Sequence, residues 1–234
     1  MSQPLLSVKN VSVAFDGVFA LHNVSFTVEP LETLAVIGPN GAGKTVLFRA
    51  LIGSAPYTGE IQWAKNVRIG YVPQKLDLER DVPLSLQDFL AIRFRLLGER
   101  SGNPKEAIEH VHLPATLLSS RIGDLSSGQF QRALIAFALI GKPNVLLFDE
   151  PTASIDFPRE EQIYDMLHEL QDEYGLTLLL ISHDLNIVYR YATTVLCLNQ
   201  ELLCHGAPQT TLTPEALKKV YGTTALYHHH HDTH

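Results

Sequence analysis

The sequence has 234 residues, of which 45% are hydrophobic, and carries a formal net charge of −7 at pH 7. That length supports one sizeable hydrophobic core, and the acidic balance argues against a protein that binds nucleic acid through a basic surface. No apolar run approaches the roughly 18 residues of a membrane-spanning helix, so we expect a chain that does not cross a bilayer and lies in the cytoplasm.

The N-terminal part contains a glycine-rich segment between a predicted strand and a predicted helix. Apolar and polar residues alternate over 5–28, which predicts antiparallel strands, and a short buried strand over 33–37 precedes a helix over 44–52. The segment GPNGAGKT between them fits a pattern whose backbone N–H groups wrap phosphates, with Lys44 reaching the outer phosphates and Thr45 placing its hydroxyl on Mg²⁺. An ordinary glycine turn is the alternative. The predicted ATP-binding residues are Gly38, Pro39, Asn40, Gly41, Ala42, Gly43, Lys44 and Thr45.

A second candidate anion site follows a polar stretch rich in predicted helix. After a predicted strand over 67–72 and Gln74, the chain favours helices near 86–97 and 104–112. It then reaches LSSGQ at the start of an apolar helix predicted over 128–140, whose N-terminus would attract an anion. The residues concerned are Leu125, Ser126, Ser127, Gly128 and Gln129. A plain serine N-cap is the alternative interpretation.

Two carboxylates follow the apolar run over 145–148. A core strand of a parallel sheet delivers charged groups to its carboxyl edge in this way. Asp149 suits a Mg²⁺ ligand, directly or through water, and Glu150 is placed to polarise the water that attacks the γ-phosphate of ATP. The alternative is that the two carboxylates cap a helix.

The C-terminal part adds a strand, a histidine and a hairpin. An apolar strand is predicted over 176–181 before His183, and a hairpin is predicted over 195–205 with its turn at Gln200 and Glu201. That turn would set Cys197 opposite Cys204. Two cysteines argue against a disulfide framework, so we predict packing thiols in a reducing compartment rather than metal ligands or a redox pair.

The order of these motifs resembles the ATP-binding subunit of ABC transporters over roughly residues 5–220. The resemblance implies that Phe15 stacks on the adenine, with a core phenylalanine as the alternative. It implies that Gln74 lies at Mg²⁺ and senses a membrane partner, and that His183 contacts the γ-phosphate. Asp156, in the segment after Pro151, resembles the acid that couples two sites across a dimer.

The fold class is predicted to be α/β. The resemblance implies a phosphate-loop ATPase core with an antiparallel β-subdomain and an inserted helical subdomain at about 76–135. These parts would form a single ABC ATPase domain over 1–225, followed by a histidine-rich tail over 226–234.

The mechanism that the resemblance implies uses two copies of the chain. Each ATP would be held by the phosphate loop of one copy and the LSSGQ helix end of the other, and hydrolysis at Glu150 would reopen the dimer and drive an integral membrane permease from the cytoplasmic face. One departure from the family pattern is Ser127, where a glycine would tolerate positive φ and close phosphate approach. Serine there would restrict that approach or add a hydroxyl donor.

Two features point to a metal cargo. The segment 71–90 resembles that of zinc and manganese importer ATPases and is closest to the zinc type, which implies an extracytoplasmic metal-binding protein acting through the permease. The tail places histidines at His228, His229, His230, His231 and His234, and neutral imidazoles bind Zn²⁺ well. A purification tag is the alternative origin of this tail.

Other functions stay open at this point. The same motifs would serve an importer of manganese, iron or a non-metal nutrient. A soluble ABC ATPase acting on ribosomes or DNA is a further alternative, which the acidic balance disfavours.

Overall fold

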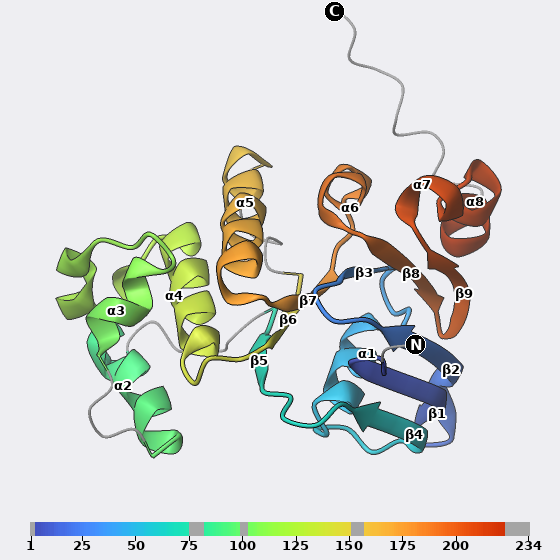
Figure 1. The fold of residues 1–234 in the computed structure, drawn as a ribbon, viewed down its shortest axis with the longest axis horizontal. Helices are drawn as coiled ribbons and strands as arrows, with labels where there is room; N and C mark the ends of the chain where they lie inside the picture. The colour runs from blue at the N-terminus through green and yellow to red at the C-terminus, as the bar shows by residue number, and fades with distance from the viewer. Residues whose placement is uncertain (1–2, 75–81, 99–102, 151–156, 223–234) are drawn as a thin grey trace, which may run out of the picture. The chain divides into compact units, whose positions relative to one another are not determined.

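The computed structural model describes residues 3–74, 82–98, 103–150 and 157–222. The chain divides into two compact units, the first formed by residues 1–65 with 179–234 and the second by residues 66–178. Figure 1 shows the elements of each unit. Asp156 and the tail histidines lie outside the described residues.

The first unit contains a three-stranded antiparallel sheet. Its strand order is β2-β1-β4, where β1 is Leu6–Phe15, β2 is Val18–Val28 and β4 is Thr58–Trp63. The leucine and the valines of β1 are all buried, and more exposed residues stand between them, as one face of a strand on a core requires. The antiparallel strands predicted over 5–28 are therefore confirmed.

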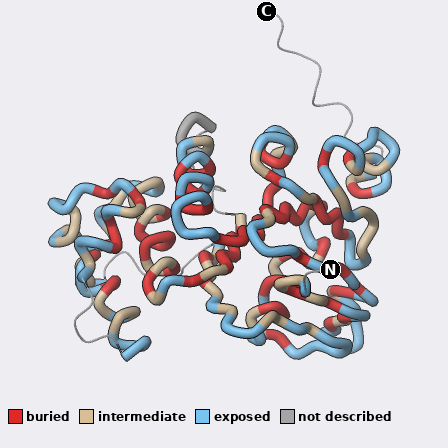
Figure 2. The backbone as a smooth tube through the Cα atoms, in the orientation of Figure 1, coloured by how far each residue is buried: buried red, intermediate tan, exposed pale blue. Residues whose placement is uncertain are grey.

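Other strands of the first unit share a cluster of buried apolar residues with helices of the same unit. β3 (Thr33–Ile37) pairs in parallel with β8 (Thr194–Asn199), which pairs antiparallel with β9 (Glu201–Gly206). All five residues of β3 are buried (Figure 2), because a parallel strand is covered on both faces. Helices of this unit are α1 (Lys44–Leu51), α6 (Leu185–Tyr191), α7 (Pro208–Thr211) and α8 (Pro214–Tyr221).

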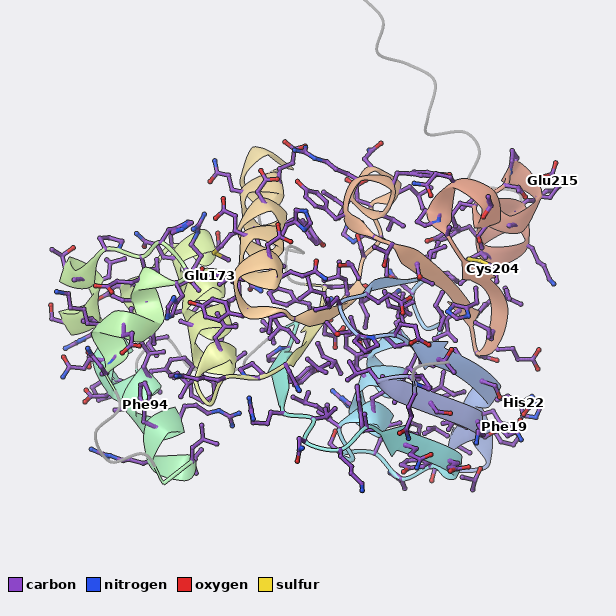
Figure 3. The ribbon with its side chains drawn as sticks, viewed as in Figure 1. Phe19, His22, Phe94, Glu173, Cys204 and Glu215 are labelled. Carbon is purple, nitrogen blue, oxygen red and sulfur yellow. A yellow bond between two sulfur atoms is a disulfide. The ribbon has the colours of Figure 1, made fainter. Side chains whose placement is uncertain are left out.

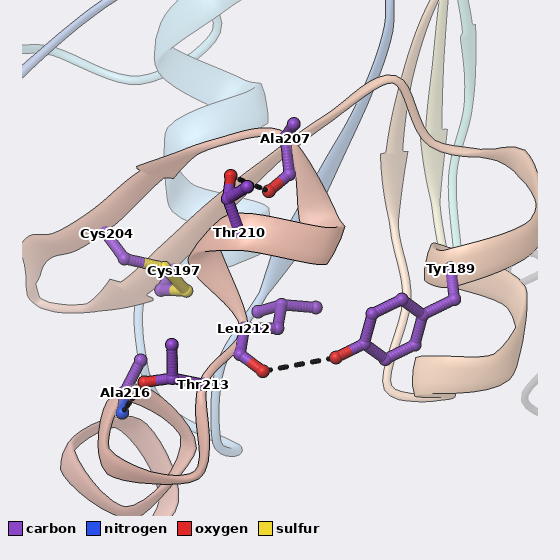
Figure 4. The surroundings of a disulfide bond; sticks show 8 residues. All are labelled: Tyr189, Cys197, Cys204, Ala207, Thr210, Leu212, Thr213 and Ala216. Atoms are coloured by element: carbon purple, nitrogen blue, oxygen red, sulfur yellow. Dashed lines mark hydrogen bonds between the residues drawn. A yellow bond between two sulfur atoms is a disulfide. The ribbon is translucent and has the colours of Figure 1, made fainter.

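The β8–β9 hairpin corrects the prediction for the two cysteines. They pair directly across the hairpin with a Cα–Cα distance of 4.8 Å, inside the range of a disulfide, and a disulfide joins them (Figures 3 and 4). The prediction of packing thiols is therefore wrong. It was based on the small number of cysteines and the expected reducing compartment, whereas the antiparallel register of β8 and β9 places the two sulfur atoms together. The turn also differs: Asn199 pairs with Glu201, and Gln200 alone turns with φ 60° after a register shift at Cys197 and Leu198.

The second unit combines two parallel strands with a group of helices. β5 (Ile69–Val72) pairs with β6 (Val145–Asp149), and β7 (Thr177–Ile181) begins in this unit and ends in the first. The helices are α2 (Leu86–Leu96), α3 (Pro104–Glu109), α4 (Ser127–Leu139) and α5 (Phe157–Tyr174), with short 3₁₀ turns at Ala115–Ser119 and Ile122–Asp124.

The helices α2, α3 and α4 contact one another, and the rings of Phe89 and Phe137 stack with centroids 4.6 Å apart. α3 ends earlier than predicted, because the chain turns after it and His112 adopts a left-handed backbone with φ 54°. None of the helices in the described parts of the chain combines the length and apolar character that crossing a bilayer requires.

Candidate active site

The phosphate loop, residues 38–45, joins the buried strand β3 to α1 in the first unit. Gly43 caps α1 with a left-handed backbone (φ 94°), and no side chain caps the helix or places an acid in its first turn. The N–H groups at this helix start therefore keep their positive potential for an anion. The helix predicted over 44–52 is confirmed, with Ile52 as its C-cap.

Only glycine fits two positions of this loop. A Cβ atom on Gly43 would lie 2.5 Å from the carbonyl oxygen of Ala20 in β2, and one on Gly38 would collide with the carbonyl oxygen of Leu198 in β8. Gly41 is different, because a Cβ there meets nothing within 4 Å. The loop is thus held from both sides by backbone and opens at Gly41, which suits a group that approaches the backbone closely.

Lys44 folds over the loop that precedes it. Its side chain is buried, and Nζ donates to the carbonyl oxygens of Gly38 (2.9 Å) and Pro39 (3.2 Å). The phosphate loop also lies close to Tyr221 of α8. Burial raises the pKa of the Tyr221 phenol, and the backbone of Gly38 in the loop lowers it by a smaller amount. The Lys44 ammonium group therefore lies at the carbonyl oxygens of the phosphate loop, and Thr45 follows Lys44 in the first turn of α1.

Two further predicted site residues of the first unit, Phe15 and His183, are exposed. Phe15, at the end of β1, is 50% exposed, which excludes the alternative of a core phenylalanine and presents a ring face for stacking. On β2, the strand that pairs with β1, the rings of Phe19 and His22 contact each other with centroids 4.8 Å apart (Figure 3). His183 is also exposed, in the turn before α6, where Asp184 caps the helix through the amide of Asn186 at 2.7 Å.

The carboxylate edge, formed by Asp149 and Glu150, lies in the second unit. Asp149 ends β6 and is 1% exposed, and its Oδ2 accepts a hydrogen bond from the Tyr71 hydroxyl at 3.2 Å. The Gln74 amide donates to Glu150 Oε2 at 2.5 Å. Glu150 itself adopts a left-handed backbone with φ 46°, a conformation that costs a non-glycine residue about 1 kcal/mol.

These contacts bring three predicted residues together, Gln74, Asp149 and Glu150. The helix that the two carboxylates would cap under the alternative interpretation falls at residues 151–156, which lie outside the described residues. Sequence reasoning missed Tyr71, whose position next to Asp149 depends on the pairing of β5 with β6. Oxygen donors of this kind fit Mg²⁺, which prefers carboxylates and amide carbonyls.

The LSSGQ segment forms a complete helix start at α4. Ser126 Oγ accepts from the amide of Gln129 (3.3 Å), and Gln129 Oε1 accepts from the amide of Ser126 (2.9 Å), which together form a capping box. The serine N-cap is therefore present. Ser127 starts the helix, is exposed and has no positive φ, so it requires no glycine-like backbone here. A Cβ on Gly128 would meet nothing within 4 Å, which leaves the helix start open to a ligand.

A cavity of about 510 Å³ in the second unit contains none of the predicted site residues. Phe94, Arg68 and Lys142 line it, together with His110, whose Nδ1 lies 2.6 Å from the Tyr174 hydroxyl. Burial, with the neighbouring Glu173, raises the pKa of Tyr174 to about 12, so the phenol stays protonated. The predicted site residues therefore lie at the ends of strands and helices, and none of them lines this cavity.

Comparison with known proteins identifies the family of the chain. The ABC transporter family model matches residues 21–153. Relatives from Haemophilus influenzae and Hydrogenovibrio crunogenus, both named zinc import ATP-binding protein ZnuC, are 34% and 36% identical to this chain. The matches cover 98% and 99% of this chain and 87% and 94% of those proteins.

A solved structure of a metal-chelate type ABC transporter in an inward-facing conformation is also similar. It is 26% identical, with a TM-score of 0.82, and the match covers 93% of this chain and 89% of that one. The predicted α/β fold of an ABC ATPase is thereby confirmed. The family model spans more than half of the chain and the relatives nearly all of it, so the chain belongs to the ABC transporter family.

Proposed function

We propose that this chain is the ATP-hydrolysing subunit of an ABC importer that takes up zinc through a separate membrane permease. The observation that carries the proposal is the structure of the phosphate loop. Only glycine fits at positions 38 and 43 of this loop, and the Lys44 side chain is hydrogen-bonded to the loop carbonyl groups. The zinc import names of relatives that align over nearly the whole chain support the cargo.

ATP binding begins with the backbone of the phosphate loop. The N–H groups of the α1 start and the Lys44 ammonium neutralise the phosphates, and the exposed ring of Phe15 stacks on the adenine. Thr45, Gln74 and Asp149 would hold Mg²⁺, which supplies positive charge to the transferred phosphoryl group when it is bound. Each of these residues has an oxygen atom of the kind that Mg²⁺ prefers.

Hydrolysis then depends on Glu150 as the general base. Its carboxylate orients the attacking water and accepts a proton from it, a role worth roughly 10²- to 10⁴-fold in rate. The Gln74 amide donates a hydrogen bond to one oxygen of this carboxylate, and Glu150 has a left-handed backbone with φ 46°. His183, exposed before α6, contacts the γ-phosphate.

Two copies of the chain act together. The open, capped start of α4 binds the ATP held by the partner copy, and Asp156, which lies outside the described residues, couples the two sites. Phosphate release removes the bridge between the copies, and the dimer reopens. The dimer works on the cytoplasmic face of a membrane and drives the permease, to which an extracytoplasmic metal-binding protein delivers the ion.

The base assignment is tested with Glu150→Gln. We expect at least a roughly hundredfold loss of ATP hydrolysis and an ATP-trapped dimer in size-exclusion chromatography, because the amide cannot accept the proton. Glu60→Gln is the matched control, since Glu60 is exposed and forms a surface ion pair with Lys9 at 3.7 Å. Hydrolysis that persists in the Glu150 variant, without a trapped dimer, would contradict the assignment.

The cargo is tested by measuring ATP hydrolysis of the complex with its co-purifying permease in liposomes, with metals delivered by the binding protein. Stimulation by Zn²⁺ alone is expected. Stimulation by Mn²⁺, Fe²⁺ or no metal would keep the ATPase role and overturn the zinc cargo. Deleting residues 228–234 is expected to weaken Zn²⁺ binding or the zinc response of turnover, and no change in either would remove the tail from the proposal.

A further inference from the structure

Tyr71 makes a contact with the predicted Mg²⁺ ligand that the sequence motifs do not include. It lies on β5, is half-buried, and its hydroxyl donates to Asp149 Oδ2 at 3.2 Å. Asp149 is 1% exposed, and a buried carboxylate is stable only when donors satisfy its oxygens. The Tyr71 hydroxyl is one such donor, and it comes from the neighbouring strand and not from the motif itself.

The strand that carries Tyr71 is firmly held. A Cβ atom on Gly70 would lie 2.8 Å from both the carbonyl oxygen of Ala138 in α4 and the side chain of Leu146 in β6, so the β5 backbone packs directly against both elements. Val72, on the other side of Tyr71, is fully buried. The phenol therefore projects from a fixed backbone, and its hydroxyl restricts the rotation of the Asp149 carboxylate.

Tyr71 on β5 and Gln74 just after it each donate a hydrogen bond to a different carboxylate. The exposed amide of Gln74 holds Glu150, and the half-buried hydroxyl of Tyr71 holds Asp149. We propose that Tyr71 is a positioning residue that orients the Asp149 carboxylate for the Mg²⁺ ion accompanying ATP. The inference rests on the proposed ATP hydrolysis and adds a residue to it.

The test uses Tyr71→Phe, which removes the hydroxyl and keeps the ring. Mn²⁺ serves as a paramagnetic substitute for Mg²⁺, and its binding is measured by electron paramagnetic resonance with ATP in the Glu150→Gln background, where turnover does not interfere. We expect Mn²⁺ binding to weaken roughly 10-fold, as when a hydrogen-bond partner of a metal ligand is removed. Binding of a fluorescent ATP analogue in EDTA should stay within about twofold of the parent protein, because the phosphate loop is unchanged.

Steady-state kinetics of Tyr71→Phe in the otherwise natural chain give a second readout. The Mg²⁺ concentration for half-maximal hydrolysis should rise roughly 10-fold while kcat at saturating Mg²⁺ changes by less than about threefold. Tyr57→Phe is the matched control, because Tyr57 is an exposed tyrosine of the first unit. A merely structural role would change thermal unfolding and metal-free nucleotide binding as well.

A double-mutant cycle with Asp149→Asn decides whether Tyr71 acts through Asp149. If it does, Tyr71→Phe has no further effect on Mn²⁺ binding in the Asp149→Asn background. Unchanged Mn²⁺ binding in Tyr71→Phe, or an equal loss with and without Asp149, would overturn the inference. Failure of the parent protein to bind Mn²⁺ with ATP would instead overturn the proposed function and this inference with it.

Discussion

The phosphate loop and the carboxylate edge follow similar strands but are built in different ways. β3 and β6 are both five-residue strands in which every residue is buried, and each leads into predicted site residues. The loop after β3 is shaped by backbone, since neighbouring carbonyl groups leave no space for a Cβ at Gly38 or Gly43. The carboxylates at the end of β6 accept hydrogen bonds from side chains, those of Tyr71 and Gln74. A substitution in the backbone-shaped loop should therefore reduce both stability and ATP binding. A substitution of a side-chain donor at the carboxylates should reduce activity and leave stability nearly unchanged.

The largest effect is expected for Gly43→Ala. The new Cβ would meet the Ala20 carbonyl oxygen at 2.5 Å, on a backbone with φ 94°, so we expect a loss of about 2–4 kcal/mol in the free energy of unfolding. ATP affinity should fall by at least roughly 100-fold, because the loop must move to accommodate the methyl group. Chemical denaturation and ATP titration measure the two losses.

Gly41→Ala is the matched control for this change. It has a similar backbone, with φ 80°, but its Cβ meets nothing within 4 Å. We therefore expect only about 1 kcal/mol of destabilisation from the left-handed conformation. Equal destabilisation in the two variants would show that conformation and not the close approach of β2 governs the loop.

Gln74→Met should reduce activity with little effect on stability, in contrast to Gly43→Ala. It removes the amide that donates to Glu150 and keeps the length of the side chain. We expect hydrolysis to fall roughly 10- to 100-fold, as for other residues that orient a site, with less than about 0.5 kcal/mol of change in unfolding free energy at this exposed position. Gln62→Met, on an exposed position of β4, controls for the loss of a surface amide. A stability loss as large as that of Gly43→Ala would erase the contrast between the two regions.

A smaller effect is expected for Ser126→Ala at the start of α4. The capping box is lost, which costs about 1 kcal/mol of unfolding free energy. Ser119→Ala is the control, since the hydroxyl of that exposed serine donates to the Thr116 carbonyl in its own turn over a long 3.4 Å. Denaturation curves of the two variants that coincide would contradict the assigned cap.

Ser127→Gly should have the smallest effect. Ser127 is exposed with a helical backbone, so glycine gains no conformation that the structure needs, and helix propensity predicts a cost of about 0.5 kcal/mol. ATP hydrolysis should change by less than about threefold. A large gain in hydrolysis would indicate that the site needs positive φ here when it binds ATP.

Features with local causes were predictable from the sequence. α1 begins at the loop's Lys44, and α4 begins within one residue of its predicted start, because a glycine or a capping serine marks each boundary. The strand before Asp149 was predictable from its apolar run. The disulfide was not, because composition and compartment say nothing about the register that places Cys197 opposite Cys204.

The sequence by itself determined which chemical groups this protein carries and in what order, since a phosphate loop, a helix cap and a strand ending in carboxylates are each specified by a few consecutive residues. Only the tertiary structure decided which donor meets which carboxylate. Tyr71 and Asp149 are separated by 78 positions in the chain, and they meet because β5 pairs with β6. Strand pairing is a long-range choice set by burial and hydrogen bonding across the sheet, and no local pattern records it.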